Sequence, residues 1–285
     1  MIPKVSIIIL TYNAVSTLGE VFDEAISSAL NQDYPHIEVI VVDNCSSDNT
    51  FNYVNSKYRE KLKVFKLPKN YGYCLGNNLA LKYADRNAKY ILFQNPDAIL
   101  AKDYVRKLVK VMERDSSVAA IQGLEIQPSK KYLRIGGFLN TAGYSLDVLP
   151  RLNNSIRQCS ETLFAFGAAL LVKRSAFEVA GGFPSNYFLY YDEADLGIKL
   201  RALGFKILGC THTYYIHFIS GTISKLRGFN PVVLYFSNRN RLLTVLKYFH
   251  GRHLIRALIL NAIIMLVHFI IGPATRRRVI INITR

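Results

Sequence analysis

Short apolar runs alternate with amphipathic patterns over the first 125 residues of the chain. The runs are rich in β-branched and aromatic residues and end in polar turns, as buried strands do; they are Val5–Leu10, Ile37–Val42, Leu62–Leu67 and Tyr90–Phe93. Strand–helix–strand units of this kind predict an α/β fold with a mostly parallel sheet flanked by helices. Such sheets bind ligands in the crevice outside the carboxyl ends of their strands.

The first helical pattern follows the first strand. Thr17 and Glu20 have the spacing of a capping box, which predicts that a helix begins there. Its apolar residues fall on one face: Leu18, Val21, Phe22, Ala25, Ala29 and Leu30. We expect Tyr34-Pro35 to stop this helix.

The middle of the chain shows less regular patterns. Residues 124 to about 162 have no clear period and are rich in Gly, Asn and Ser, so we expect irregular structure there. A strand is predicted at Phe166–Val172 and a helix from about Asp192 to Gly204.

The C-terminal tail differs from the rest. Tyr235–Tyr248 has the pattern of a basic amphipathic helix, and Ala257–Ile271 is almost wholly apolar. About 20 apolar residues are needed to cross a bilayer, so this run favours a helix that lies in the membrane interface. Basic residues flank it at Arg252, Arg256 and Arg276–Arg278, which favours the cytoplasmic face on both sides. The alternative is a core helix packed on the preceding domain.

Charge is distributed unevenly. The net charge is +16, and residues 196–285 hold 14 Lys and Arg with no Asp or Glu. A basic half implies an anionic partner, either nucleic acid or anionic lipid. The apolar run within that half, and the acidic residues at the mouth of the predicted sheet, favour an anionic membrane surface and no nucleic acid.

Four cysteines are scattered along the chain at positions 45, 74, 159 and 210. They form no C-x-x-C pair, which excludes the usual zinc spacings and indicates no disulfide framework. We therefore expect unpaired cysteines in a reducing compartment.

Polar clusters follow the predicted strands at the positions where loops should leave the carboxyl edge of the sheet. They are Thr11-Tyr12-Asn13, Asp43-Asn44 with the polar residues up to Thr50, Asn70-Tyr71-Gly72 with Gly76-Asn77-Asn78, and Asn95-Pro96-Asp97. Each is also what an ordinary turn or helix cap contains. A carboxylate such as Asp43 at the mouth of a parallel sheet can bind a ribose hydroxyl or a base N–H. A divalent cation bound with a diphosphate uses one or two carboxylates, and Asp97 could supply one.

An acidic cluster, Asp192-Glu193-Ala194-Asp195, opens the later helix. Carboxylates at a helix N-terminus are stabilised by the helix dipole, which is a purely structural explanation. The preceding Phe188–Tyr191 is an apolar aromatic wall, and a carboxylate beside such a wall suits a general base. A helicase is excluded because the chain has no G-x-x-x-x-G-K-[ST] phosphate loop.

Together these motifs resemble the inverting, nucleotide-sugar-dependent glycosyltransferases of the GT-A fold, family 2 type, especially rhamnosyl- and galactofuranosyltransferase-like members. The resemblance covers residues 3 to about 248 and includes Val5–Asn13, Val41–Asn44, Gly181-Gly182-Phe183 and Asn238–Arg241. It implies a Mg²⁺ or Mn²⁺ ion at Asp97, with His217 as a further ligand and His212 as a weaker candidate. The residues it places at the donor are Thr11, Tyr12, Asn13, Asp43, Asn44, Asn70, Gly72, Asn78 and Asn95.

Two positions depart from the family pattern. Asn95 stands where the first acidic residue of the metal motif is usual, and the Glu-Asp pair is reversed to Asp192-Glu193. Alignment with the family places Glu193 at the position of the general base, and Asp192 and Asp195 are the alternatives for that role.

These patterns predict a nucleotide-sugar-binding half at 1–125, an acceptor-binding half at 126–230, and a membrane-associated helical tail at 231–285. The expected activity is transfer of a sugar from a nucleotide diphosphate donor to a lipid-linked or polysaccharide acceptor. We expect a peripheral or monotopic protein on the cytoplasmic face of the cell membrane. A sugar-nucleotidyltransferase is the rival enzyme class, but it should carry a Gly- and Arg-rich phosphate loop after strand one, where this chain has Thr11-Tyr12-Asn13.

Overall fold

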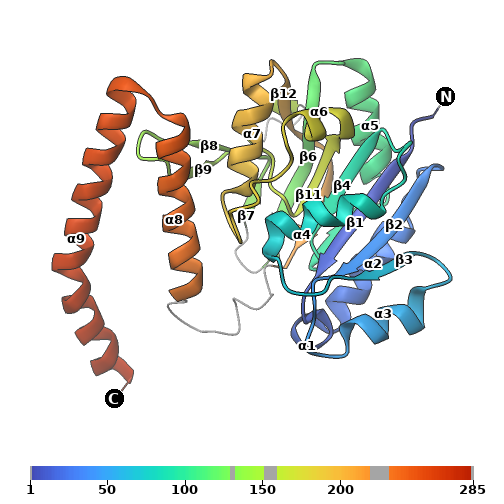
Figure 1. The fold of residues 1–285 in the computed structure, drawn as a ribbon, viewed down its shortest axis with the longest axis horizontal. Helices are drawn as coiled ribbons and strands as arrows, with labels where there is room; N and C mark the ends of the chain where they lie inside the picture. The colour runs from blue at the N-terminus through green and yellow to red at the C-terminus, as the bar shows by residue number, and fades with distance from the viewer. Residues whose placement is uncertain (1, 129–131, 151–158, 219–230, 284–285) are drawn as a thin grey trace.

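A mixed ten-stranded sheet forms the centre of the protein in a computed structural model (Figure 1). The structure describes residues 2–128, 132–150, 159–218 and 231–283, with side chains in the last helix up to residue 267. The strands run in the order β10-β12-β6-β11-β4-β1-β2-β3, with β5 added beside β12 and β7 beside β6. Their bounds are β1 Val5–Thr11, β2 Ile37–Asp43, β3 Lys63–Lys66, β4 Tyr90–Gln94, β5 Ala98–Leu100, β6 Val118–Gln127, β7 Tyr132–Arg134, β10 Cys159–Glu161, β11 Ala169–Lys173 and β12 Lys206–His217.

The four strands predicted in the first half are all present, and they pair in parallel as β3-β2-β1-β4. Parallel pairing follows from the helical crossovers between them: α1 Ala14–Leu18, α2 Glu20–Leu30, α3 Thr50–Tyr58 and α4 Gly72–Ala80, the last followed by the short 3₁₀ turn η1 at Leu81–Tyr83. The sheet is less parallel than the pattern predicts, because β11 lies antiparallel between β4 and β6.

The first predicted helix is divided in two. Gly19 adopts a left-handed φ of 57° between α1 and α2, and it is the N-cap residue of α2. The predicted capping box is therefore wrong: the Thr17 hydroxyl donates to the Asn13 carbonyl at 2.6 Å. Glycine enters the left-handed region without a steric penalty, so it can break a helical pattern that the apolar spacing makes appear continuous.

The segment expected to be irregular contains several strands. Besides the end of β6, it includes β7, β10 and a separate hairpin of β8 Gly137–Leu139 and β9 Ser145–Asp147. All four are only three residues long, which is too short to show a period in the sequence, and β7, β9 and β10 are exposed or half-exposed. The predicted strand at Phe166–Val172 begins three residues later, at Ala169.

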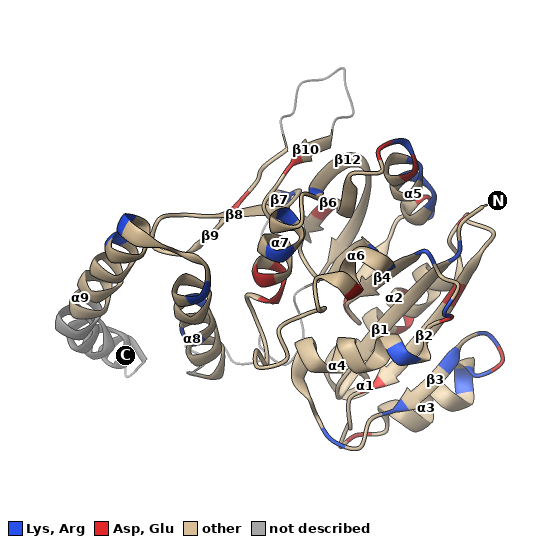
Figure 2. Ribbon diagram, turned by 45° about the horizontal axis from the view of Figure 1, so that its top comes forward, with Lys and Arg blue, Asp and Glu red and all other residues tan. Residues whose placement is uncertain are grey.

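The remaining helices are α5 Tyr104–Arg114, α6 Arg174–Val179, α7 Asp192–Ala202, α8 Pro231–Tyr248 and α9 Gly251–Ile283. The helix predicted from Asp192 is confirmed as α7, and Gly204 follows it with a φ of 84°. α8 and α9 stand side by side, and α9 forms the outer edge of the molecule (Figure 1). Figure 2 shows basic residues near the α8–α9 junction. None of the helices in the described part of the chain combines the length and the apolarity needed to cross a membrane.

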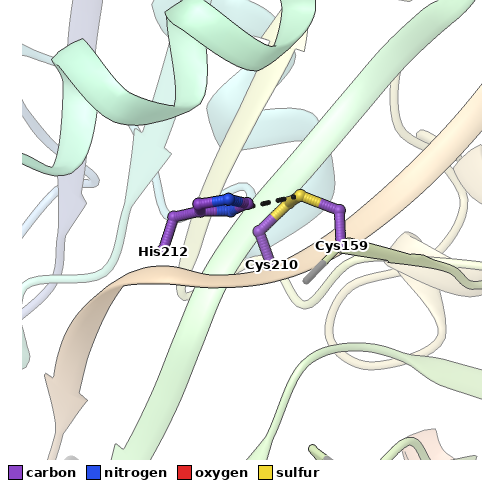
Figure 3. A group of neighbouring side chains, drawn as sticks. All are labelled: Cys159, Cys210 and His212. Atoms are coloured by element: carbon purple, nitrogen blue, oxygen red, sulfur yellow. Dashed lines mark hydrogen bonds between the residues drawn. A yellow bond between two sulfur atoms is a disulfide. The ribbon is translucent and has the colours of Figure 1, made fainter. Parts of the chain in front are cut away.

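Cys159 and Cys210 form a disulfide between β10 and β12 (Figure 3). The expectation that all four cysteines are unpaired is therefore wrong for this pair, while Cys45 and Cys74 are free. The two residues are separated by 51 positions, and they meet because β10 pairs antiparallel with β12 at this register. The spacing of the cysteines in the sequence does not indicate that these two strands pair.

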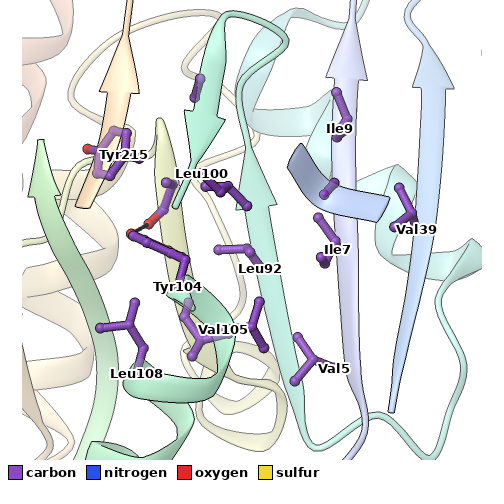
Figure 4. Close-up of a cluster of buried hydrophobic side chains, with 14 of the residues drawn as sticks. Val5, Ile7, Ile9, Val39, Leu92, Leu100, Tyr104, Val105, Leu108 and Tyr215 are labelled. Carbon is purple, nitrogen blue, oxygen red and sulfur yellow. Dashed lines mark hydrogen bonds between the residues drawn. The ribbon is translucent and has the colours of Figure 1, made fainter. Parts of the chain in front are cut away.

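The core is divided between the two faces of the sheet. Ile7 and Ile9 point to one face, where they pack with residues of α2 and α5 (Figure 4). Ile8 and Leu10 point to the other face, which α4, α6 and α7 cover. Because successive strand residues alternate in direction, a strand buried on both faces reads as a continuous apolar run.

Candidate functional site

Thr11 and Asp43 lie side by side at the carboxyl ends of β1 and β2. Asp43 is buried, and its carboxylate accepts hydrogen bonds from the backbone N–H and the hydroxyl of Ser46. Asn13 has a left-handed φ of 52°, and its side-chain oxygen accepts a hydrogen bond from the Ser47 N–H at 2.8 Å. Thr11 is also buried, and its hydroxyl has no hydrogen-bond partner among the described residues. The loops after β1 and β2 thus form one polar surface, which we call the polar wall, and the Thr11 hydroxyl in it has no hydrogen-bond partner among the described residues.

The third polar cluster joins this wall. Asn44 donates to the Asn70 side-chain oxygen at 3.0 Å and to the Gly72 carbonyl at 3.1 Å. Gly72 has a φ of 72°, and a Cβ there would lie 2.4 Å from the Phe188 carbonyl oxygen. A side chain at position 72 would therefore push away the segment that leads into α7. Tyr12, between these loops, is 38% exposed, which leaves its ring accessible.

A cleft of about 620 Å³ opens at the carboxyl ends of β4 and β12. This is the expected place in an α/β sheet, and the volume suits a small-molecule ligand. It is lined by Tyr73, Asn95, Gln127, Tyr132, Arg134, Asp147, Phe166, Gly167, Ala168, Leu189, Tyr190, Asp192, Glu193 and His217. Asp192 and Glu193 of the predicted acidic cluster, the predicted His217 and Asn95 therefore share one cavity.

The three carboxylates at the start of α7 lie in different surroundings. Asp195 is fully buried and lies outside the cleft lining, beside Lys199 at 2.8 Å, Lys247 at 2.6 Å and the Tyr248 hydroxyl at 2.6 Å. Burial alone would raise the pKa of Asp195, but the ion pair with Lys199 and the hydrogen bonds from Lys247 and Tyr248 outweigh it and hold that pKa below its usual value. Asp195 is thus an ionised group, and its hydrogen bonds with Lys247 and Tyr248 connect α7 to α8.

Asp192 and Glu193 both line the cleft. Asp192 is 4% exposed, and burial together with the neighbouring Glu193 charge raises the pKa of Asp192 well above its usual range. Asp192 therefore holds a proton more readily than an exposed carboxylate does. Glu193 is half-buried, within reach of a ligand in the cleft.

A strained turn positions this acidic pair. Tyr190 and Tyr191 have left-handed φ values of 68° and 64°, which non-glycine residues adopt rarely and at a cost of about 1–3 kcal/mol each. Asn240 of α8 stabilises the turn by donating to the carbonyls of Leu189 at 2.7 Å and Tyr190 at 3.0 Å. The direction in which Glu193 points thus depends on a contact with α8.

His217 ends β12 between two carboxylates. Its Nε2 lies 3.3 Å from Asp97 and its Nδ1 lies 2.8 Å from Glu125. Burial lowers the pKa of His217, but the hydrogen bonds with Asp97 and Glu125 outweigh it and raise that pKa to about 9. The metal ligands expected from the sequence, Asp97 and His217, are therefore neighbours.

The donor set at this position fits a divalent cation. Asp97 is 7% exposed and offers a carboxylate oxygen, and a cation bound beside it would replace the proton that His217 Nε2 directs toward Asp97. Histidines that bind metals usually donate their other ring N–H to a carboxylate, which is what Glu125 provides. Carboxylate oxygen and imidazole nitrogen are both ligands of Mn²⁺-type ions.

Two predicted residues lie elsewhere. Asn78 has both ends of its amide bonded to the backbone of Phe183, at 2.8 and 3.0 Å, so its described contacts are structural. His212 lies beside Cys159, with its Nδ1 at 3.4 Å from the Cys159 sulfur, and not beside Asp97.

Glu125 and Arg134 are site residues that sequence reasoning missed. Glu125 is fully buried and accepts hydrogen bonds from Arg134 at 2.8 and 2.9 Å. Burial would raise the pKa of Glu125, but the His217 hydrogen bond and the Arg134 charge lower it strongly. The alternation of apolar and polar residues from Leu124 to Gln127 was the available signal, because it predicts a strand with Glu125 on its polar side.

Comparison with known proteins identifies the class. Residues 6–180 match the model of glycosyl transferase family 2, and the chain belongs to this family. It is 25% identical over 216 residues to the O-antigen chain rhamnosyltransferase WbaN of Salmonella anatum, covering 75% of this chain and 66% of that one. It is 31% identical over 126 residues to the putative teichuronic acid biosynthesis glycosyltransferase TuaG of Bacillus subtilis, covering 44% of this chain and 48% of that one. The match thus spans about half to two thirds of these relatives.

Solved structures confirm the GT-A type of fold. GalNAc-T7, solved with UDP, GalNAc and Mn²⁺, superposes with a TM-score of 0.65 at 14% identity, covering 88% of this chain and 49% of that one. The mannosyltransferase PcManGT from Pyrobaculum calidifontis, solved with GDP-Man and Mn²⁺, has a TM-score of 0.58 at 17% identity, covering 93% and 81%.

Proposed function

We propose that this chain transfers a sugar, with inversion, from a nucleotide diphosphate donor to a lipid-linked or polysaccharide acceptor hydroxyl. The observation that carries the proposal is the shared cleft, in which Glu193 lies on one side and His217, the neighbour of Asp97, on the other. Membership of glycosyl transferase family 2 supports the reaction class. The names of WbaN and TuaG, which refer to O-antigen and teichuronic acid, support an envelope polysaccharide or its lipid-linked precursor as acceptor.

Glu193 is the general base in this proposal. Asp192 is 4% exposed, whereas Glu193 is half-buried in the cleft lining and is the more accessible carboxylate for an acceptor hydroxyl. Asp195 is bound by two lysines and lies outside the cleft lining. Glu193 removes the acceptor proton while the hydroxyl oxygen attacks the anomeric carbon from the face opposite the leaving diphosphate. A single displacement with one base and no covalent intermediate inverts that carbon.

The polar wall and the turn after β4 bind the donor in this proposal. Thr11, Asn13 and Asp43 hold the base and ribose through the polar wall at the ends of β1 and β2, and Asn95 faces the donor from the turn after β4. Asp97 and His217 would hold Mg²⁺ or Mn²⁺, which when bound offsets the negative charge that develops on the leaving diphosphate. The Mn²⁺ in the structures of GalNAc-T7 and PcManGT supports this ion.

The tail would hold the active site at the cytoplasmic face of an anionic membrane. Ala257 and Asn261 are the buried residues in the described part of α9, whereas Ile255, Ile259 and Ile263 are each more than half exposed. A core helix would bury most of its apolar residues. The described part of α9 is apolar around its circumference but buries only a narrow stripe, which argues against the alternative of a core helix. Asn261 donates to the Ala142 carbonyl at 3.0 Å and so fixes which side packs inward. The arginine cluster expected at 276–278 lies outside the described side chains.

A thermal-shift screen with nucleotide diphosphate sugars, with and without Mn²⁺, tests the donor class. A ligand that binds only the folded state at 100 times its dissociation constant adds about 2.7 kcal/mol of stability, so at least one donor should raise the melting temperature. The anomeric configuration of the product, measured by NMR, then tests inversion. A flat response to the whole panel in both metal conditions would refute the proposed function.

A further inference from the structure

Cys159, Cys210 and His212 meet in a part of the sheet that does not line the cleft (Figure 3). Cys210 and His212 are two residues apart on β12, so their side chains leave the strand on the same face. Cys159 lies directly opposite Cys210 on β10. Three metal-binding side chains are thus brought together by strand pairing, although the proposed reaction uses none of them.

The distance between the His212 nitrogen and the Cys159 sulfur fits a small tetrahedral ion. The two sulfurs and one imidazole nitrogen all lie within 4.8 Å of one another, and His212 Nδ1 is 3.4 Å from the Cys159 sulfur. In a tetrahedral zinc site with Zn–S of about 2.3 Å and Zn–N of about 2.0 Å, the S···N edge is about 3.5 Å. The ring already points at the sulfur pair, and once the disulfide is reduced the two sulfurs would separate to about 3.8 Å, the S···S edge of the same tetrahedron.

The backbone around the cluster is also fixed before any ion binds. The His212 carbonyl accepts a hydrogen bond from Lys107 of α5 at 2.8 Å, and Cys210 is fully buried. β10 reaches the main sheet only through its pairing with β12 among the described strands. A crosslink between Cys159 and Cys210 therefore secures an edge strand that has one neighbour.

We propose that Cys159, Cys210 and His212 form a Zn²⁺ site when the two cysteines are reduced, with water as the fourth ligand. The disulfide is the oxidised, metal-free state of the same site. Two electrons and two protons convert the disulfide into two thiols. Zn²⁺ then displaces both thiol protons to solvent and accepts one electron pair from each sulfur and one from the imidazole. The two states exclude each other, because sulfurs that are bonded together cannot both be thiolate ligands.

The test uses the full chain, stripped of metal and reduced with a water-soluble phosphine. The phosphine supplies both electrons and takes an oxygen atom from water, whose protons end on the sulfurs. Co²⁺ is the probe, because thiolate ligands give it an intense charge-transfer band that oxygen and nitrogen ligands at Asp97 and His217 cannot give. We expect one Co²⁺ with this band per reduced chain, displaced by Zn²⁺, and no band in the disulfide form.

Variants separate the site from other thiols. The double variant Cys159→Ser/Cys210→Ser should lose the band, while Cys45→Ser and His36→Gln, which lie outside the cluster, should keep it. His212→Gln retains both cysteines and the disulfide, and it should weaken Co²⁺ binding by at least about tenfold. The proposal is overturned if the reduced chain, with two additional thiols confirmed by titration, shows no band, or if the band persists in the double variant. Neither outcome bears on the donor screen.

Discussion

Asp97 and His217 lie 3.3 Å apart across the pairing of β5 with β12, although Asp97 belongs to the first half of the chain and His217 to the second. Leu100 pairs with Tyr215 and Ala98 pairs with His217, so the turn after β4 lies directly beside the end of β12. The proposed metal site therefore depends on the register of two strands as much as on the two side chains.

Asp97→Ala should abolish Mn²⁺-dependent donor binding, because Asp97 brings the carboxylate at this site. His217→Ala should weaken that binding less. Calorimetric titration of donor with and without Mn²⁺ measures both effects, and Asp33→Ala, at an exposed ion pair with Arg106, is the matched control. Full activity of the unmodified chain in excess chelator would rule out the metal and leave Asp97 as a hydrogen-bond acceptor for the donor.

Glu193→Gln should lower the turnover number by about 10²–10⁴-fold with donor affinity nearly unchanged, because it removes only the general base. Asp192→Asn should cost less, since Asp192 is almost fully buried and Glu193 is the more accessible carboxylate. Glu60→Gln, at an exposed position, is the control. If Glu193→Gln stays within about threefold of wild type, well below the effect of a general base, the role belongs to another carboxylate.

Asp195→Asn should lower the free energy of unfolding by about 1–3 kcal/mol near neutral pH, because a charged acceptor for two lysines is lost. The pKa of Asp195 is lowered in the folded state, so its contribution is complete above the unfolded value of about 3.9 and is lost as the pH falls through the folded pKa. Urea unfolding at several pH values should therefore show the gap between the two proteins closing below about pH 4. Glu178→Gln, at an exposed i,i+4 pair with Arg174, should cost about 0.5 kcal/mol or less. A gap that stays constant with pH would contradict this role for Asp195.

The full chain should pellet with anionic vesicles and resist extraction by high salt alone, because apolar burial by α9 adds to about 1 kcal/mol per basic residue near the surface. A chain truncated after His250 should stay in the supernatant, still bind donor, and lose activity on lipid-linked acceptors first. Replacing the exposed Ile259 and Ile263 by Glu should have the same effect as truncation. Val179→Glu, at an equally exposed apolar residue on α6, should not. Recovery of the full chain in the supernatant at low salt would refute membrane binding.

How far the sequence predicted this structure depends on the range of the interactions involved. Continuous apolar runs identified the parallel strands, because burial on both faces is a local property of each run. The acidic cluster and the polar clusters at the strand ends could also be identified, because each consists of neighbouring residues in the sequence. Glu125 was missed, and so was the pairing of Cys159 with Cys210, because each depends on which strand lies beside which. The different roles of Asp192 and Asp195 also required the structure, since burial and the lysine of another helix determine them.

The contact between Asn240 and the carbonyls of Leu189 and Tyr190 has a consequence for how the protein can be divided. Composition places a break where the basic half begins, well ahead of α8. Tyr190 and Tyr191, the two residues with left-handed φ before the acidic cluster, lie in a turn that Asn240 of α8 binds. Lys247 and Tyr248, near the end of α8, bind Asp195. The shortest fragment with an intact site must therefore run through Tyr248, the last residue of α8.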